Sequence, residues 1–368
     1  MEPAKKLPMT FTLLLFISMS AAFIFGFMDQ YINRDFERLH IFLFNLTSGG
    51  FTILYFTDKR ERPGIRSVLF FLLSILYAFL AFFELYLPAA FTAVVLAIIV
   101  ETYRREISPF FPVIFFKTGE STSRKFHNAS LLCLVLALLL SSFVILNNTW
   151  LKFFYFEKLT LNVFFLGFSF PVSLITMSAI FSILEKNKSR ALQVLEHIFF
   201  WSICGGVIIF FLFILAQSFS GEVFISFYLF ITVLCIFAVF FRYGKKMQQK
   251  YFLVSAIYFL LCTAITGILY ILLKELPSYD LYGKIVLRMH AFYSLYGWNL
   301  TGMMVIIRWG DFPITLNTRG AIFFHWGVIL LFAPMAKFYP VFTIPAIVSY
   351  IVFLAVFFFT GNRVRTAL

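Results

Sequence analysis

The sequence predicts an all-α integral membrane protein: a bundle of about 12 transmembrane helices with both termini cytoplasmic. Hydrophobic residues make up 61% of the 368 residues and charged residues only 13%, whereas a soluble domain carries about 25% charged residues. Apolar runs long enough to cross a bilayer recur along the chain, and Lys and Arg alternate between its connections. We therefore expect residues 1–368 to form a single polytopic membrane domain.

The first apolar run, 9–28, is too long for the core of a signal peptide and is expected to be the first span. A membrane helix needs about 20 mostly apolar residues. The runs that approach this length are 9–28, 39–56, 67–86, 88–103, 128–147, 160–184, 194–217, 222–243, 250–273, 286–308, 320–336 and 339–361. The weakest of them are 39–56, which contains several polar residues and glycines, and 88–103, which is short. The apolar segment 109–116 is shorter and contains two prolines, so it is expected to be interfacial or re-entrant.

The distribution of basic residues supports this count and orientation. If the N-terminus is cytoplasmic, 22 of the 30 Lys and Arg residues fall in cytoplasmic segments and 8 in external ones. Cytoplasmic loops normally carry this excess. A missed span in the middle of the chain would exchange the two sides from that point on and remove the bias.

The net charge of +13 has the same origin. It indicates contact with the lipid bilayer, and with anionic lipid headgroups at the cytoplasmic loops, and not a nucleic-acid surface. The partners expected are therefore lipid and, in some functions, further membrane subunits. All four cysteines lie inside apolar runs without metal-ligand spacing, so no metal site or disulfide framework is predicted.

Histidines suggest one possible cofactor site. His40 and His290 each begin a span that runs from the outside inward, and paired neutral histidines are the axial ligands of b-type haem. Tyr293 and Gly297 follow His290 at i+3 and i+7, on the same helical face, where Gly297 leaves space for a flat macrocycle. The cofactor-binding residues of this hypothesis are His290, His40, Gly297 and Tyr293, and the cofactor is haem b. The other interpretation is that imidazole simply suits the wet interface. The remaining histidines, His127, His197 and His325, are expected in the first turns of spans on the cytoplasmic side.

Uncharged polar residues suggest a second kind of site. Asn45, Asn162 and Asn299 are the deepest amides, and in hydrocarbon they must either join helices or line a polar cavity. Asn-Leu-Thr occurs at both 45–47 and 299–301, which adds Thr47 and Thr301 to the substrate-binding candidates. Candidate helix breaks, which can expose backbone to a solute, are Ser48-Gly49-Gly50, Phe170-Pro171, Cys204-Gly205-Gly206 and Pro334. Membrane helices tolerate glycine and proline, so each of these sites alone favours a packing kink.

Two short stretches resemble known families. His290-Ala291 and Gly297-Trp298 resemble the His-Ala-His, four-residue, Gly-Trp helix of the haem–copper oxidase catalytic subunit, but Phe292 replaces its second histidine. Asp58 to Arg66 is similar in order, but not in spacing, to the loop after the second span of the major facilitator superfamily. Neither stretch implies membership.

The leading functional hypothesis is a transporter or permease for a small neutral or lipid-like solute, in the cell inner membrane. The alternative is a haem-binding or quinone-handling respiratory membrane subunit with histidine axial ligands. The common catalytic motifs are absent from the sequence, which leaves open whether the protein is an enzyme.

Overall fold

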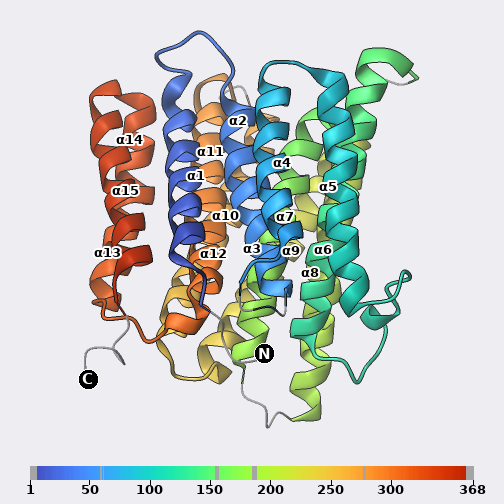
Figure 1. The fold of residues 1–368 in the computed structure, drawn as a ribbon, viewed down its shortest axis with the longest axis vertical. Coiled ribbons are helices and arrows are strands. Elements are labelled where there is room, and N and C mark those ends of the chain that lie inside the picture. The colour runs from blue at the N-terminus through green and yellow to red at the C-terminus, as the bar shows by residue number, and fades with distance from the viewer. Residues whose placement is uncertain are drawn as a thin grey trace.

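The computed structural model describes residues 6–58, 60, 62–153, 157–184, 189–276 and 279–361. Within these residues the regular elements are all helices, arranged as a bundle with roughly aligned axes (Figure 1). The prediction of an all-α membrane protein is confirmed.

Ten helical segments in the described residues are long and apolar enough to cross a membrane. They are α1 (Met9–Met28), α2–η1–α3 (Glu37–Thr57), α4 (Ile65–Phe82), α5 (Tyr86–Ile107), α6–η3 (Thr122–Leu151), α8 (Arg190–Leu215), α9 (Phe219–Tyr243), α10 (Gln248–Leu273), α13–η6–α14 (Thr318–Phe338) and η7–α15 (Pro340–Phe359). Two further helical segments complete the bundle: α7 (Glu157–Ile183) and α11–η4–α12 (Tyr279–Ile307). The two weakest runs, 39–56 and 88–103, are both helices of full spanning length.

The centre of the bundle is formed by segments that are far apart in the chain. In α2–η1–α3, 89% of the residues of an apolar 18-residue stretch are buried, whereas the corresponding shares are 33% in α8 and 28% in α9, which face outward. All eight residues of α12 (Leu300–Ile307) are buried as well. Figure 1 places α13, α14 and α15 at one side of the bundle and α4, α5 and α6 at the other. The segments that hold the two Asn-Leu-Thr sequences are therefore enclosed by the rest of the protein.

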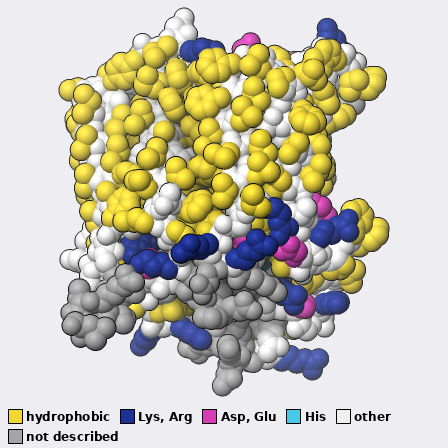
Figure 2. Space-filling view, in the orientation of Figure 1, with side chains coloured by type: hydrophobic (Ala, Val, Ile, Leu, Met, Phe, Trp, Pro, Cys, Tyr) yellow, Lys and Arg dark blue, Asp and Glu magenta, His cyan; other side chains and the backbone are white. Residues whose placement is uncertain are grey.

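The two ends of the described chain lie at the same end of the bundle (Figure 1). Lys6 is 3.3 Å from Asp311, and Arg308 pairs with Asp311 at 3.0 Å. The backbone N–H of Thr315 donates to the Gly361 carbonyl at 2.9 Å. Figure 2 shows a broad hydrophobic band, with Lys and Arg side chains gathered below it toward this end. Residues near both ends of the described chain therefore lie at the basic end of the bundle.

The chain remains helical through both glycine pairs that were candidate helix breaks. Gly49 and Gly50 mark the change from a π-helix to an α-helix, and Gly205 and Gly206 lie inside α8. A Cβ atom on Gly49 would lie 2.4 Å from Val172, and one on Gly50 would lie 2.6 Å from Phe70. These two glycines therefore permit close helix packing, which is a common use of glycine in membrane bundles.

The prolines also remain within helical structure. Pro171 is inside α7, and Pro334 lies in the first turn of α14 (Ala333–Phe338), directly after the π-helix η6 (Val328–Phe332). Membrane helices tolerate proline because neighbouring groups satisfy the freed backbone carbonyls. The hydroxyl of Ser130 in α6 donates to the Pro171 carbonyl at 2.8 Å, which joins α6 to α7 beside this proline.

Candidate functional site

Two π-helical segments meet at the centre of the bundle. η1 (Phe42–Gly49) follows α2 (Glu37–Ile41), and η4 (Tyr293–Asn299) follows α11 (Tyr279–Phe292). Each is followed by an eight-residue α-helix, α3 (Gly50–Thr57) or α12. π-Helical turns cost stability and occur frequently at functional sites. The paired placement of η1 and η4 makes this crossing the principal candidate site.

An uncharged polar cluster joins these segments to α7. We define the amide cluster as Asn45, Ser169, Ser173, Trp298 and Asn299. The side-chain amide of Asn299 donates to Asn45 Oδ1 at 3.2 Å and to Ser169 Oγ at 2.8 Å. Its carbonyl oxygen accepts from Ser173 Oγ at 3.1 Å, and Trp298 Nε1 donates to the same Ser173 oxygen at 2.9 Å. The structure therefore brings together Asn45 and Asn299, two of the three amides that the sequence marks as deeply placed.

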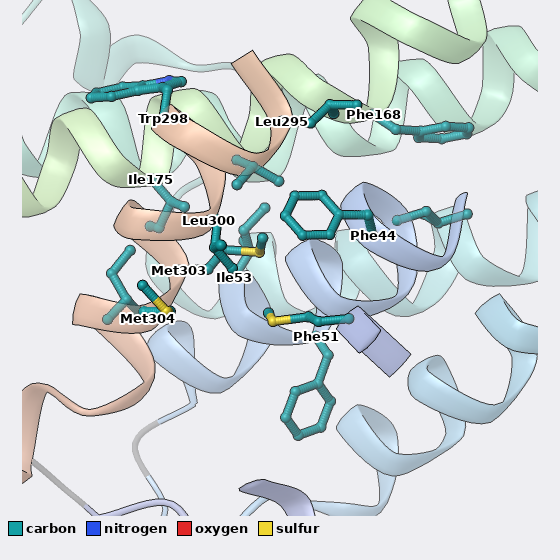
Figure 3. Packing of buried hydrophobic residues seen from close by; sticks show 14 of the residues in the cluster. Phe44, Phe51, Ile53, Phe168, Ile175, Leu295, Trp298, Leu300, Met303 and Met304 are labelled. Atoms are coloured by element: carbon teal, nitrogen blue, oxygen red, sulfur yellow. The ribbon is translucent and has the colours of Figure 1, made fainter. Parts of the chain in front are cut away.

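The amide cluster lies in an otherwise apolar environment. Figure 3 shows Phe44, Phe168, Leu295, Leu300 and Met303 packed in this region of the bundle. Asn45 is 1% exposed and Asn299 is fully buried. In the described residues, the buried charged side chains lie within about two turns of a helix end, as in Asp58, Arg104, Lys125, Glu196, Glu222, Arg308 and Asp311. The site can thus bind by hydrogen bonding but has no charge with which to bind an ion.

Two polar groups beside the cluster lack partners. Asn45 Nδ2 and Thr47 Oγ1 are buried and make no hydrogen bond to any residue that the structure describes. A buried polar group without a partner costs about 1–3 kcal/mol. Thr301 differs, because its hydroxyl donates to the Gly297 carbonyl at 2.7 Å. Asn162 lies in α7 at a position whose side chain is outside the described part of the structure.

The predicted haem residues have distinct surroundings. His290 Nδ1 hydrogen-bonds to the Thr263 carbonyl of α10 at 2.9 Å. Gly297 faces α10 too, where a Cβ atom would lie 2.4 Å from the Phe259 ring. Both residues therefore lie against α10. The Phe259 ring occupies the space that was expected to be open beside Gly297.

His40 has a different set of neighbours. It lies against α1, where a Cβ atom on Gly26 would be 3.8 Å from the imidazole and 3.7 Å from the Tyr296 hydroxyl. His40 Nδ1 is buried and makes no hydrogen bond to the residues that the structure describes. Tyr293 is buried in η4. The described residues contain no group of three or more His, Cys, Asp or Glu side chains placed to hold a metal ion.

Several central residues were not predicted. The Tyr296 ring packs against Phe23 and Phe44, each with ring centroids 4.8 Å away, and its carbonyl hydrogen-bonds to His325 Nε2 at 2.8 Å. His325, expected in the first turn of a span, is instead buried and stacks on Phe353. The only sequence signal for the α7 serines is their i, i+4 spacing in an apolar run, which places both on one helix face.

Comparisons with protein-family models, with curated proteins and with solved structures gave no match for this chain. The fold alone therefore defines its class. The chain is a helical multi-pass membrane protein with an enclosed, uncharged polar site at the crossing of two π-helical segments.

Proposed function

We propose that the chain crosses the cell inner membrane twelve times, with both termini in the cytoplasm. Ten segments have the length and apolar composition of spans, and α7 and α11–η4–α12 run through the same bundle. The shared position of Lys6 and Gly361 at the basic end of the bundle supports an even count and, by the excess of basic residues, a cytoplasmic location.

A topology measurement tests this proposal. A reporter inserted at Asn148 in η3 (Asn147–Leu151) should be external, while one inserted at Gly119 should be cytoplasmic. Paired alkaline phosphatase and fluorescent protein fusions at these two positions distinguish the sides. The same side for both positions would contradict the proposal, because α6 (Thr122–Leu146) separates them.

We further propose that the protein is a permease for a small neutral solute, with a lipid-like solute as the other member of the class. The observation that supports this proposal is the amide cluster together with two buried polar atoms, Asn45 Nδ2 and Thr47 Oγ1. Neither atom makes a hydrogen bond to the described residues. Membrane transporters commonly bind solute near the midplane at irregular helical segments. The substrate-binding residues of this proposal are Asn45, Thr47, Asn299, Thr301 and Asn162.

The geometry suggests how such a solute would bind. Asn299 Nδ2 now donates to Asn45 Oδ1, and the surrounding space is filled by side chains (Figure 3). A solute that carries both a hydrogen-bond donor and an acceptor can replace this amide–amide bond and also satisfy Asn45 Nδ2. The enclosed position favours a small solute over a lipid, because it limits the volume that a ligand can occupy.

Flux through purified protein in liposomes tests the permease proposal. Stopped-flow light scattering with glycerol and with urea should show faster equilibration than in protein-free liposomes, and Asn45→Leu should reduce the difference. A fluorescent phospholipid with dithionite quenching tests the lipid-like arm. Rates equal to those of protein-free liposomes with all three probes would refute the proposal.

One observation favours the second candidate, a haem- or quinone-handling subunit. His290 Nδ1 faces a backbone carbonyl, an arrangement that makes Nδ1 the protonated nitrogen and leaves Nε2 free to bind iron. The proposed partner is His40, whose Nδ1 has no hydrogen bond. To admit a macrocycle, the Phe259 ring beside Gly297 would have to move.

A spectrum decides the haem proposal. Protein purified from haem-replete cells should show a reduced-minus-oxidised Soret band if His290 is an axial ligand, and His290→Ala should remove most of it. His197→Ala is the matched control, because His197 is a half-buried imidazole on α8 whose Nε2 hydrogen-bonds to the Thr118 carbonyl. A featureless difference spectrum for the unmodified protein excludes this alternative.

A further inference from the structure

The connection between α5 and α6 presents aromatic side chains to the surroundings of the bundle. It contains Pro-Phe-Phe-Pro-Val-Ile-Phe-Phe at 109–116, with one short 3-10 turn, η2 (Val113–Phe115). Phe111 and Phe116 are 72% and 71% exposed, whereas Ile114 is 5% exposed. We define residues 109–118 as the aromatic ledge. One side of the ledge packs on the protein, and the other side is apolar and exposed.

Basic side chains hold the backbone of the ledge in place. Arg104 donates to the carbonyls of Pro109 and Phe110 at 3.0 and 3.1 Å, and Lys125 Nζ donates to the Phe115 carbonyl at 2.8 Å. His197 Nε2 hydrogen-bonds to the Thr118 carbonyl at 3.0 Å. Carbonyls that enter the apolar part of a bilayer need such partners. The ledge is therefore attached to α5, α6 and α8.

Ring contacts reinforce this attachment. The Phe115 ring lies 5.3 Å from Phe200, and the Phe116 ring lies 5.1 Å from Trp201, measured between ring centroids. Both partners are on α8. The shape of the ledge is thus set by the bundle, and the exposed phenylalanines keep a fixed height relative to it.

The position and charge of the ledge indicate its partner. The connection projects sideways from the bundle (Figure 1), and in this region Figure 2 shows hydrophobic side chains beside Lys and Arg at the lower edge of the apolar band. Arg105 lies 4.5 Å from the Phe110 ring centroid, and Lys117 is exposed. Aromatic rings and basic groups together suit the boundary between acyl chains and anionic headgroups.

We propose that the aromatic ledge inserts into the interface of the surrounding bilayer, in the leaflet at the basic end of the bundle. Phe110, Phe111 and Phe116 enter the acyl boundary, and Lys117 binds anionic lipid headgroups. The bilayer, and not a second protein, is the occupant, because the exposed rings stand at the edge of the apolar band that lipid already covers.

Spin labels measure the depth of the ledge directly. In a background with the four native cysteines changed to alanine, Phe111→Cys and Phe116→Cys are labelled in nanodiscs of phosphatidylcholine with phosphatidylglycerol. We expect the ratio of oxygen to nickel-chelate accessibility to be several-fold higher at both positions than at Gly119→Cys. Gly119 is the matched control because it is exposed just beyond the ledge, with no neighbour within 4 Å of an added Cβ atom.

Each alternative has its own result. Equal nickel-chelate accessibility at positions 111 and 119 places the ledge in water and overturns the proposal. Low accessibility to both reagents at position 111 indicates protein cover and overturns it as well. The ratio at position 111 should fall in pure phosphatidylcholine, or when Lys117→Gln is added; no change in either case would refute the role of anionic lipid.

Discussion

Replacing Gly302 by alanine is expected to destabilise the protein more than any other single methyl addition in the bundle core. A Cβ atom at this position would lie 2.0 Å from Thr176 Oγ1 and 2.8 Å from Thr176 Cβ. Because the Thr176 Cβ atom is fixed to the backbone of α7, a change of rotamer cannot remove the clash. Overpacking of this kind costs about 1–3 kcal/mol. The unfolding temperature in detergent, followed by Trp fluorescence, should fall accordingly.

Two further variants make this result specific. Thr176→Ala should restore much of the lost stability when combined with Gly302→Ala, because it removes two of the clashing atoms, Oγ1 and Cγ2. Gly205→Ala in α8 is the matched control, since nothing lies within 4 Å of its added Cβ atom. Equal unfolding temperatures for Gly302→Ala and Gly205→Ala would show that α7 and α12 do not approach this closely.

Replacing Asn299 by leucine should lower both stability and any solute flux. The substitution removes the hydrogen bonds to Asn45, Ser169 and Ser173 and leaves these groups in an apolar environment. Hydrogen bonds between membrane helices average about 0.6 kcal/mol and reach about 1.7. With three partners lost, we expect a decrease of about 2 kcal/mol. Thermal unfolding and liposome flux, measured on the same preparation, check the two effects.

Two further variants distinguish the loss of the amide cluster from the general effect of replacing any amide side chain. Asn33→Leu changes an exposed amide in the connection between α1 and α2 and should alter neither quantity. Asn45→Leu should destabilise less than Asn299→Leu, because Asn45 accepts one hydrogen bond from the cluster and its Nδ2 has no partner in the described residues. A variant Asn299→Leu with unchanged stability would mean that the amide cluster does not join η1, η4 and α7.

The sequence predicted the class of fold because that class depends on properties that are local in the chain. The run 88–103 was one of the two weakest candidates, yet Tyr86–Ile107 is a full-length helix, since about 20 apolar residues in a row have few alternatives in a membrane. The basic residues likewise predicted that both ends share a side. Asn45 and Asn299 were recognised as groups that need partners, from their chemistry and depth alone.

The partners themselves depend on helix packing, which no local pattern contains. Asn45 and Asn299 are 254 residues apart in the chain and meet because α2–η1–α3 and α11–η4–α12 are both central. Ser169 and Ser173 join them only because α7 passes the same crossing. His325 is buried instead of interfacial for the same reason, since α15 and η4 cover it.

The glycines show most clearly the difference between what the sequence determines and what the tertiary structure determines. Gly49, Gly50 and Gly302 were visible in the sequence as small residues, and glycine in a membrane helix permits either a break or close packing. Neighbouring side chains, Val172 at Gly49 and Thr176 at Gly302, select close packing within continuous helix. The apolar runs alone thus determined the length of the spans, and the basic residues alone predict the side of each terminus. The choice between a break and a contact required the position of the neighbouring helix, because the free energy of packing depends on atoms that are distant in the chain.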